Sequence, residues 1–410
     1  MGTFCREEDL LLSKINDDEV VNFLSELIQY NSSYPPGDTR KIAQFCQNKL
    51  SEFDIDAKIF TSPPDVKSAI GDNFDSSNYQ SVIATIGEGD HILTLHSHID
   101  TVSAGNLNDW QEDPFAGKII DGKIYGRGAG DDKGSVTAQV MATIAIKRSD
   151  YLLNGKIQLV LAADEEASSN RGTRWLRDSG LIDPEFLIIG EQTNNNICTV
   201  ERAILWLSIT IYGKSAHGAM PWEGNNAVIH MCNFVDRLNN EVIPLYHKEF
   251  DSSIPFSTIS MTKIRGGEKT NIIPGDCSLD VDCRLAYAKD AETILDHMVK
   301  ILQEESNKKK KFVWIINKLQ HDGTPIQTNE DASIVNVMSQ VCQDVTNNKA
   351  VTNWYKQASD GRLFSNKGIP IIIFGPGDPA LGHSPNEYVT KKQLVEATKI
   401  YALTATRLFK

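Results

Sequence analysis

Short apolar runs alternate with helical patterns at both ends of this chain, and this alternation limits the folds that it can adopt. Residues 156–162 (KIQLVLA) and 369–374 (IPIIIF) are apolar runs of strand length. Apolar residues recur at helical spacing in residues 135–148 and 391–409. Strands and helices in turn are typical of an α/β layer, so we expect an α/β domain with a mixed, largely parallel central sheet.

Two further apolar runs lie close together, at residues 81–86 and 91–95. The four residues between them, 87–90 (GEGD), are glycine and acidic residues. Two strand patterns joined by so short a segment predict a β-hairpin.

The middle of the chain differs, because apolar and polar residues alternate at period two in LWLSITIYG and STISMTKIRGG. Such alternation is typical of antiparallel strands with one exposed face. Residues 225–238 and 291–305 have helical patterns. We therefore expect a small α+β domain at residues 202–319, inserted into a larger domain made of residues 1–201 and 320–410.

The charge of the chain argues against two kinds of partner. Its 41 Lys and Arg residues against 54 Asp and Glu residues give a net charge of −13, whereas nucleic acids and anionic membranes attract a basic face. The longest apolar run, at residues 369–374, is far shorter than the roughly 20 residues of a membrane-spanning helix. We therefore expect neither a nucleic-acid nor a membrane partner.

The cysteines and the first residues bear on the location of the protein in the cell. The seven cysteines are scattered and form no CxxC pair, as expected of reduced thiols in the cytoplasm. The segment MGTFCREEDLLL lacks the basic and then apolar pattern of a signal peptide. Both features predict a cytoplasmic protein.

Side chains that can bind a metal follow the ends of several predicted strands: His98, Glu166, Glu191 and His383. In open α/β sheets, ligands bind beyond the carboxyl ends of the strands, so these four side chains could meet. His98 and Asp100 end the run LTLHSHID, where residues two apart point to one side and a carboxylate can orient an imidazole. Taken alone, they could equally be a hydrogen-bonded surface pair, and His96 is a competing candidate.

Two acidic pairs add to these candidates. Glu165 and Glu166 follow a strand, and adjacent carboxylates repel each other unless a cation or a shared proton accommodates them. Asp131 and Asp132 follow the glycine-rich GRGAG, which matches neither a dinucleotide motif nor a Walker motif. A solvated acidic loop is the alternative for both pairs.

The charges of these groups predict a two-metal site. Two imidazoles and the carboxylates of Asp131, Glu166 and Glu191 carry −3, so two divalent cations leave +1, which one hydroxide neutralises. A set with two His and no Cys favours Zn²⁺, with Co²⁺ and Mn²⁺ as alternatives. The sequence therefore predicts a two-metal hydrolase.

A series of motifs runs along nearly the whole chain: HIDTV, WQEDPF, DGKIYGRGAGDDKG, ADEEAS, GEQT, GKSAHGAMPWEGNNAV, KTNIIPG, DCRL, SDGR and GHSPNEYV. In order, spacing and context they resemble the dinuclear metallo-aminoacylase and carboxypeptidase family. That family includes acetylornithine deacetylase, succinyl-diaminopimelate desuccinylase, aminoacylase and glutamate carboxypeptidase. The resemblance implies a zinc-exopeptidase-like catalytic domain with an inserted, ferredoxin-like α+β domain for dimerisation and as a lid.

The resemblance also implies a role for each candidate. Asp131 would bridge two metals, His98 and Glu191 would complete one, and Glu166 and His383 the other. Asp100 would orient His98. Glu165 would be the general base, which takes a proton from the metal-bridging water that attacks the amide carbonyl and then protonates the leaving amine.

Further residues match positions that act on the substrate. In the family, the inserted domain supplies a His that stabilises the oxyanion in the partner's active site, and the matching residue is His217. Asn271 and Arg284 match positions that hold the substrate carboxylate, and Ser359 and Arg362 lie in SDGR, which resembles the substrate-side loop of the desuccinylases. The residues alone leave alternatives open: a polar turn residue for His217 and a structural salt bridge for Arg284.

The chain departs from many relatives at four positions near these residues. Thr101 and Ser103 stand where Val and Pro are common, Asp132 replaces a Met, and Gln192 replaces a Pro. None of these changes removes an implied ligand, but Asp132 adds negative charge beside the site.

These features predict a cytoplasmic, homodimeric amidohydrolase that removes an acetyl or succinyl group from an amino acid such as ornithine or diaminopimelate. The alternative enzyme is a dipeptidase or carboxypeptidase that cleaves a short peptide with the same residues. A catalytically inactive relative that serves as a metal-dependent binding protein is a third hypothesis, which the carboxylate of Glu165 disfavours.

Overall fold

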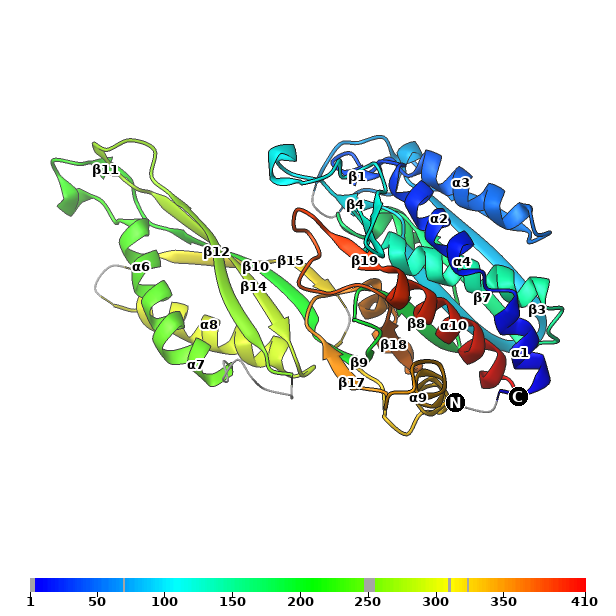
Figure 1. The fold of residues 1–410 in the computed structure, drawn as a ribbon. Coiled ribbons are helices and arrows are strands. Elements are labelled where there is room, and N and C mark those ends of the chain that lie inside the picture. The colour runs from blue at the N-terminus through cyan, green and yellow to red at the C-terminus, as the bar shows by residue number, and fades with distance from the viewer. Residues whose placement is uncertain (1–3, 69–70, 247–254, 309–310, 323) are drawn as a thin grey trace. The chain divides into compact units, whose positions relative to one another are not determined.

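The computed structural model describes all residues except 1–3, 69–70, 247–254, 309–310 and 323 (Figure 1). The chain divides into two compact units. The first unit comprises residues 1–199, 327–355 and 359–410, and the second unit comprises residues 200–326 and 356–358.

The first unit is built of helices around strands. Its helices are α1 (Arg6–Ser13), α2 (Asp17–Ile28), α3 (Arg40–Ser51), α4 (Lys133–Arg148), α5 (Trp175–Asp178), α9 (Ser333–Thr346) and α10 (Lys391–Leu408). The strands of its sheets are β1 (Ser33–Tyr34), β2 (Ala57–Thr61), β3 (Gln80–His98), β4 (Thr101–Val102), β5 (Ile119–Ile120), β6 (Lys123–Tyr125), β7 (Asn154–Ala162), β8 (Phe186–Gly190), β9 (Ile197–Glu201), β16 (Ile326–Gln327), β17 (Thr352–Tyr355), β18 (Ile371–Phe374) and β19 (Tyr388–Thr390).

An eight-stranded sheet lies at the centre of this unit. Its order is β16-β9-β18-β8-β3-β2, and in addition β7 pairs with β3 and β17 with β9. β8 runs parallel to both β3 and β18, whereas β2 is antiparallel to β3 and β9 is antiparallel to β18. The prediction of a mixed sheet in an α/β layer is therefore confirmed, although antiparallel pairings are as frequent as parallel ones in the described register.

The predicted hairpin in β3 is wrong, because its two arms pair with β7 and not with each other. From Val82 to Glu88 the partners in β7 run backwards, and from Ile92 to His98 they run forwards, so β7 lies between the arms. The turn passes very close to the start of β7: Gly87 has a φ of +85°, and a Cβ there would lie 2.3 Å from the Gly155 carbonyl oxygen. Glycine permits a tight turn and a close backbone approach alike, so the pattern could not distinguish them.

Helix α4 fixes one side of the later site. It is buried from Lys133 to Ile146, because it packs on β3 and is covered by α2 and α10 (Figure 1). A helix covered on both sides needs no exposed polar face. Its N-cap is Asp132, so the acidic pair in GRGAGDD lies where this buried helix begins. Among the described residues, no helix has the length and apolar character that a membrane span needs.

The second unit has its own sheet and core. Its strands are β10 (Ala203–Tyr212), β11 (Ala216–His217), β12 (Thr258–Gly266), β13 (Ile272–Ile273), β14 (Asp276–Leu285) and β15 (Val313–Asp322), and its helices are α6 (Ala227–Arg237), α7 (Ile243–Tyr246) and α8 (Asp290–Ser306). The four long strands form an antiparallel sheet of order β12-β14-β10-β15, in which α6 packs on β10 and β14. In β10, buried Leu205, Leu207 and Ile209 alternate with less buried residues, which explains the period of two. This strand order, with α6 after β10 and α8 after β14, is the ferredoxin-like arrangement.

Candidate metal centre

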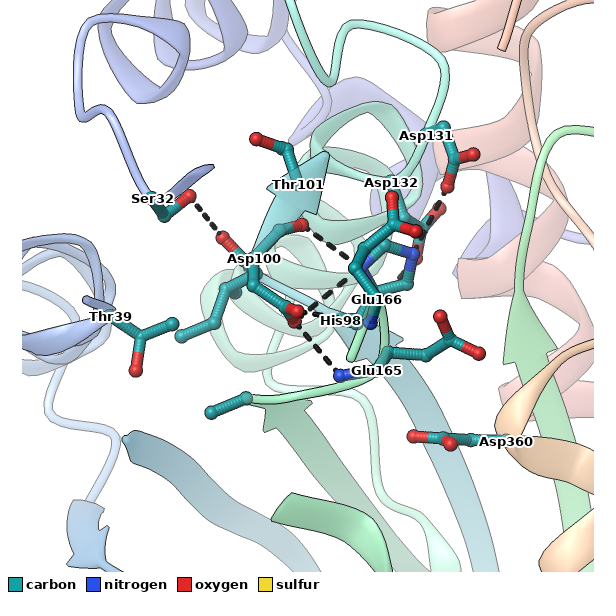
Figure 2. Close-up of polar contacts among 12 residues, drawn as sticks. Ser32, Thr39, His98, Asp100, Thr101, Asp131, Asp132, Glu165, Glu166 and Asp360 are labelled. Carbon is teal, nitrogen blue, oxygen red and sulfur yellow. Dashed lines mark hydrogen bonds and ion pairs between the residues drawn. The ribbon is translucent and has the colours of Figure 1, made fainter. Parts of the chain in front are cut away.

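The carboxyl ends of β3 and β7 lie side by side, because His98 is paired with Ala162. The loops that follow these strands are joined by Asp100 (Figure 2). Its Oδ1 accepts the backbone N–H of Glu165 at 3.2 Å, and its Oδ2 accepts the backbone N–H of Glu166 at 3.1 Å. Asp100 therefore fixes both glutamates relative to the end of β3.

His98 is oriented by its two ring nitrogens. Nδ1 lies 3.0 Å from the Asp100 carbonyl oxygen, which only accepts, so Nδ1 carries a proton. Nε2 lies 3.1 Å from Asp131 Oδ1. Because His98 is buried, Nε2 is the atom that it presents to a cation at this point.

Asp131 faces two imidazoles with different oxygen atoms. Its Oδ1 lies near His98, and its Oδ2 lies 3.2 Å from His383 Nε2. The same His383 nitrogen is 3.2 Å from Glu166 Oε1. Gln192 donates from Nε2 to Asp131 Oδ2 at 2.9 Å. The Asp131 carboxylate thus lies between the two histidines, as a bridging ligand would.

The loop that carries Asp131 wraps around the buried carboxylate of Glu387. Glu387 Oε1 accepts the N–H groups of Gly130 and Asp131 at 2.8 and 3.0 Å. Glu387 Oε2 accepts the N–H of Gly128 at 3.0 Å and a guanidinium N–H of Arg127 at 2.6 Å. Because His383 and Glu387 belong to one loop, these bonds tie two ligand-bearing loops together.

Glu191 follows β8 and is a further buried carboxylate of the candidate site. It is 3% exposed, and its Oε2 accepts the hydroxyl proton of Tyr355 at 2.9 Å. Burial and then the charge of Asp131 raise the pKa of Glu191 well above its ordinary value. A carboxylate so buried needs a positive charge nearby to stay ionised.

The pKa values of the other groups also reflect an excess of negative charge at this site. Burial would lower the pKa of His98, but the nearby carboxylates of Asp100 and Asp131 raise it well above its ordinary value. Hydrogen bonds to Asp131 and Glu166 raise the pKa of His383 to about 10. Burial and the charge of Asp131 raise the pKa of Glu166. Carboxylates that repel one another and imidazoles that hold protons both mark a place where cations fit.

The donor set fits divalent metal. Ligand atoms of His98, Asp131 and Glu166 lie within 4.8 Å of one another, and His383 Nε2 is 3.2 Å from both carboxylates. Imidazole nitrogen and carboxylate oxygen without thiolate suit Zn²⁺ and similar ions.

Comparison with known proteins agrees with this geometry. The family model described as peptidase family M20/M25/M40 matches residues 94–407, most of the chain. The chain belongs to the M20 family. It is a metallohydrolase of the peptidase and deacylase type, and the resemblance found in the sequence is confirmed.

Three relatives illustrate the range of the M20 family. A probable succinyl-diaminopimelate desuccinylase of Staphylococcus epidermidis is 25% identical to this chain, with 88% of the chain and 91% of the relative covered. The crystal structure of aminopeptidase PepT from Bacillus cereus has a TM-score of 0.75 at 18% identity, covering 97% of this chain and 100% of that one. A dinuclear metal-binding M20 peptidase of Bacillus subtilis has a TM-score of 0.70 at 15% identity, covering 96% and 98%.

Glu165 points away from the ligand cluster of this M20 protein. Its carboxylate Oε1 lies 3.3 Å from Nη1 of Arg362, whereas Glu166 lies against His383. Burial and then the charge of Asp360 raise the pKa of Glu165 to about 8, although Arg362 lowers it.

The residues of SDGR are buried in the first unit. Ser359 is the N-cap of a 3-10 helix, Asp360–Lys367, and its Oγ accepts the N–H of Gly361 at 3.2 Å. His96, the competing candidate for His98, lies on this side of the site and contacts Thr173 Oγ1 at 2.7 Å. Burial lowers the pKa of His96 to about 4, so the ring is neutral near pH 7, and its Nε2 is engaged by Thr173.

The other M20 candidates lie in the second unit, where two of them come together. β11 and β13 pair His217 with Ile272, and the Gly218 N–H donates to the Asn271 carbonyl oxygen at 2.7 Å. The exposed His217 accepts the Ala219 N–H at Nδ1, at 3.1 Å. In the neutral ring Nε2 therefore carries the proton.

Arg284 lies elsewhere in the second unit, on β14. Its Nε and Nη2 donate to the carboxylate of Asp282, two residues away on the same strand, at 3.0 and 3.1 Å. The guanidinium is therefore paired within its own strand.

Sequence reasoning missed the residues that hold the ligands. Glu387 stands in the same motif as His383, and this shared motif was a signal that could have found it. Gln192 was noticed only as a departure from relatives. For Tyr355 the sequence offers no signal, because its contact with Glu191 joins residues 164 positions apart.

Proposed function

We propose that this protein is a two-metal amidohydrolase that removes an N-acetyl or N-succinyl group from an amino acid such as ornithine or diaminopimelate. The observation that carries the proposal is the divergence of two adjacent carboxylates: Glu166 lies against His383, and Glu165 turns to Arg362. Such a pair supplies one ligand and one proton carrier. The desuccinylase names of several relatives at 25–27% identity support the acyl group.

The proposed ligands are those implied by the motifs: His98, Asp131, Glu166, Glu191 and His383. We propose Zn²⁺ as the native ion, with Co²⁺ and Mn²⁺ as ions that the same donors accept. When bound, the cations polarise the amide carbonyl and acidify the attacking water.

Glu165 is the proposed general base. It takes a proton from water as the oxygen attacks the amide carbon, and it returns the proton to the amide nitrogen as the C–N bond breaks. The products are a carboxylate and an amine. An acceptor whose pKa is raised toward 8 by burial and Asp360 can both take and return a proton near neutral pH.

Residues of the second unit are proposed to act on the substrate of a second copy in a homodimer. His217 carries its proton at Nε2 when neutral, which suits a hydrogen bond to a developing oxyanion. Asn271, held beside it, and Arg284 are proposed to bind the substrate carboxylate. Arg284 would share its guanidinium between Asp282 and the substrate. We further propose a cytoplasmic location.

A hydrolysis screen tests the proposed function. The Zn²⁺- and Co²⁺-loaded protein is incubated with N-acetylornithine, N-succinyl-diaminopimelate and simple dipeptides, beside the Glu165→Ala variant. We expect release of acetate or succinate and loss of turnover in the variant with both metals retained. Cleavage of dipeptides alone would make the protein a dipeptidase or carboxypeptidase, and full turnover by Glu165→Ala would reject the proposed base. Metal binding without hydrolysis of any amide would indicate a binding protein.

A further inference from the structure

The side chain of Arg362 is buried and turned toward Glu165. Only 5% of its side chain is exposed. Nη1 lies 3.3 Å from Glu165 Oε1 and also donates to the Ser359 carbonyl oxygen, while Nη2 donates to Ser169 Oγ at 3.2 Å. The guanidinium is therefore held from two segments, its own 3-10 helix and the loop that carries Glu165.

This burial argues against direct recognition of a substrate carboxylate by Arg362. An arginine that grips such a group offers a pair of N–H groups to it, whereas this guanidinium is directed at groups of the protein. By contrast, the side chain of Arg284 is 27% exposed.

A second carboxylate, Asp360, faces the side of the site on which Glu165 lies (Figure 2). Its Oδ2 accepts the hydroxyl proton of Thr173. Since that hydroxyl has one proton, Thr173 must accept from Nε2–H of His96, at 2.7 Å. Oδ1 of Asp360 is buried and has no hydrogen-bond partner within the described part of the chain. These bonds hold a negative charge in place beside Glu165.

Glu165 therefore stands between like charges, Glu166 on one side and Asp360 on the other. A flexible glutamate in that position turns away from its neighbours unless a cation holds it. Arg362 supplies that cation at Oε1. The contact fixes one oxygen of the carboxylate and thereby the direction in which the whole group faces.

We propose that Arg362 is a positioning residue, which holds the Glu165 carboxylate in the orientation that proton transfer requires. The inference rests on the proposed function, in which Glu165 carries the proton. A displacement of about 1 Å in a reacting group can cost about 100-fold in rate, so a residue that sets this orientation acts on kcat.

The test compares Arg362→Met and Arg362→Lys with the unchanged protein, using N-acetylornithine and N-succinyl-diaminopimelate as probes. We expect kcat to fall about 10- to 100-fold in Arg362→Met, with KM changed less than about 3-fold and both metals retained. Arg362→Lys keeps the charge but not the planar fork, so we expect an intermediate kcat. Added guanidinium ion should restore part of the kcat of Arg362→Ala. A crystal structure of Arg362→Met should show the Glu165 carboxylate displaced.

Arg407→Met is the matched control. Arg407 contacts Glu8 and Asp344 through its guanidinium, and the neighbouring Phe409 packs at Gly155, the start of β7. The candidate site lies at the other end of that strand. We expect a lower midpoint of thermal unfolding for this variant, with kcat unchanged and no response to guanidinium ion.

Other results would overturn the proposal. A raised KM at unchanged kcat in Arg362→Met would mean that the guanidinium binds the substrate. Loss of metal, or of folding, in parallel with kcat and without rescue by Arg362→Lys or by guanidinium would leave only a structural role. If Glu165→Ala keeps its turnover, the proposed function itself fails. If Glu165→Ala is inactive and Arg362→Met is unaffected, only the positioning role fails.

Discussion

Replacing the carboxylate of Glu387 by an amide tests whether this buried group holds the loop of Asp131. The carboxylate has no exposed surface, and four donors point at it: the N–H groups of Gly128, Gly130 and Asp131 and the guanidinium of Arg127. In Glu387→Gln one oxygen becomes an NH₂ group. Two of the four donors then lose their acceptor, and Arg127 loses its counter-charge.

The size of the effect follows from these contacts. Each buried donor left without a partner costs about 1–3 kcal/mol, and breaking a buried ion pair at one side costs about 3–5 kcal/mol. Because these losses overlap at Arg127, we expect the free energy of unfolding to fall by about 3–5 kcal/mol. Because Asp131 loses its support, we expect affinity for Zn²⁺ to fall about 10- to 100-fold.

Urea unfolding followed by far-ultraviolet circular dichroism measures the first quantity, and calorimetric titration with Zn²⁺ measures the second. Glu52→Gln is the control, because Glu52 is exposed and forms a surface ion pair with Lys49. We expect that variant to change the free energy of unfolding by less than about 0.5 kcal/mol. A change below about 1 kcal/mol in Glu387→Gln, with unaltered Zn²⁺ affinity, would refute the reasoning.

Further predictions concern metal, stability and assembly. Removal of the cations by a chelator should abolish hydrolysis and lower the midpoint of thermal unfolding, and added Zn²⁺ should restore both. Tyr355→Phe removes the hydroxyl that donates to Glu191, so calorimetry should show about 10-fold weaker Zn²⁺ binding. Burial would raise the pKa of Glu8, but hydrogen bonds from Arg407 lower it to about 2. The ionised carboxylate therefore stabilises the fold above the ordinary glutamate pKa, and this stabilisation is lost as the pH falls toward 2. Glu8→Gln should accordingly lower the free energy of unfolding at pH 7 but not at pH 2. If the protein is a dimer by light scattering, mixing inactive His217→Ala and Glu165→Ala chains should regain part of the activity, and no regain would contradict a shared site.

The order of elements and the fold class follow from local patterns. The helical period in residues 391–409 and the apolar run at 369–374 correspond to α10 and β18, because a buried helix and a buried strand each have a distinct apolar spacing. The pairing of the two arms of β3 could not be predicted from the sequence, because a glycine-rich turn is compatible both with a hairpin and with a strand inserted between the arms.

In the candidate site, too, contacts between residues close in sequence can be predicted, whereas contacts between distant residues cannot. His98 and Asp100 are neighbours in sequence, so their proximity can be predicted, but His98 Nδ1 contacts the Asp100 carbonyl oxygen, and the carboxylate accepts the backbone N–H groups of the two glutamates. The partner of Arg362 could not be predicted, since Glu165 lies 197 positions away. Sequence resemblance places an arginine at a motif, but whether it faces a substrate or another side chain depends on the packing of distant segments.

The insertion of β7 between the arms of β3 has a consequence for how the protein is made. When the ribosome has produced both arms, their common neighbour, residues 154–162, is still missing, and β18 follows only at residues 371–374. The first unit therefore cannot complete its sheet until nearly the whole chain has been synthesised. The sheet of the second unit lies entirely within residues 203–322. All of its strands are therefore synthesised earlier, and the second unit can fold before the last strands of the first unit have been made.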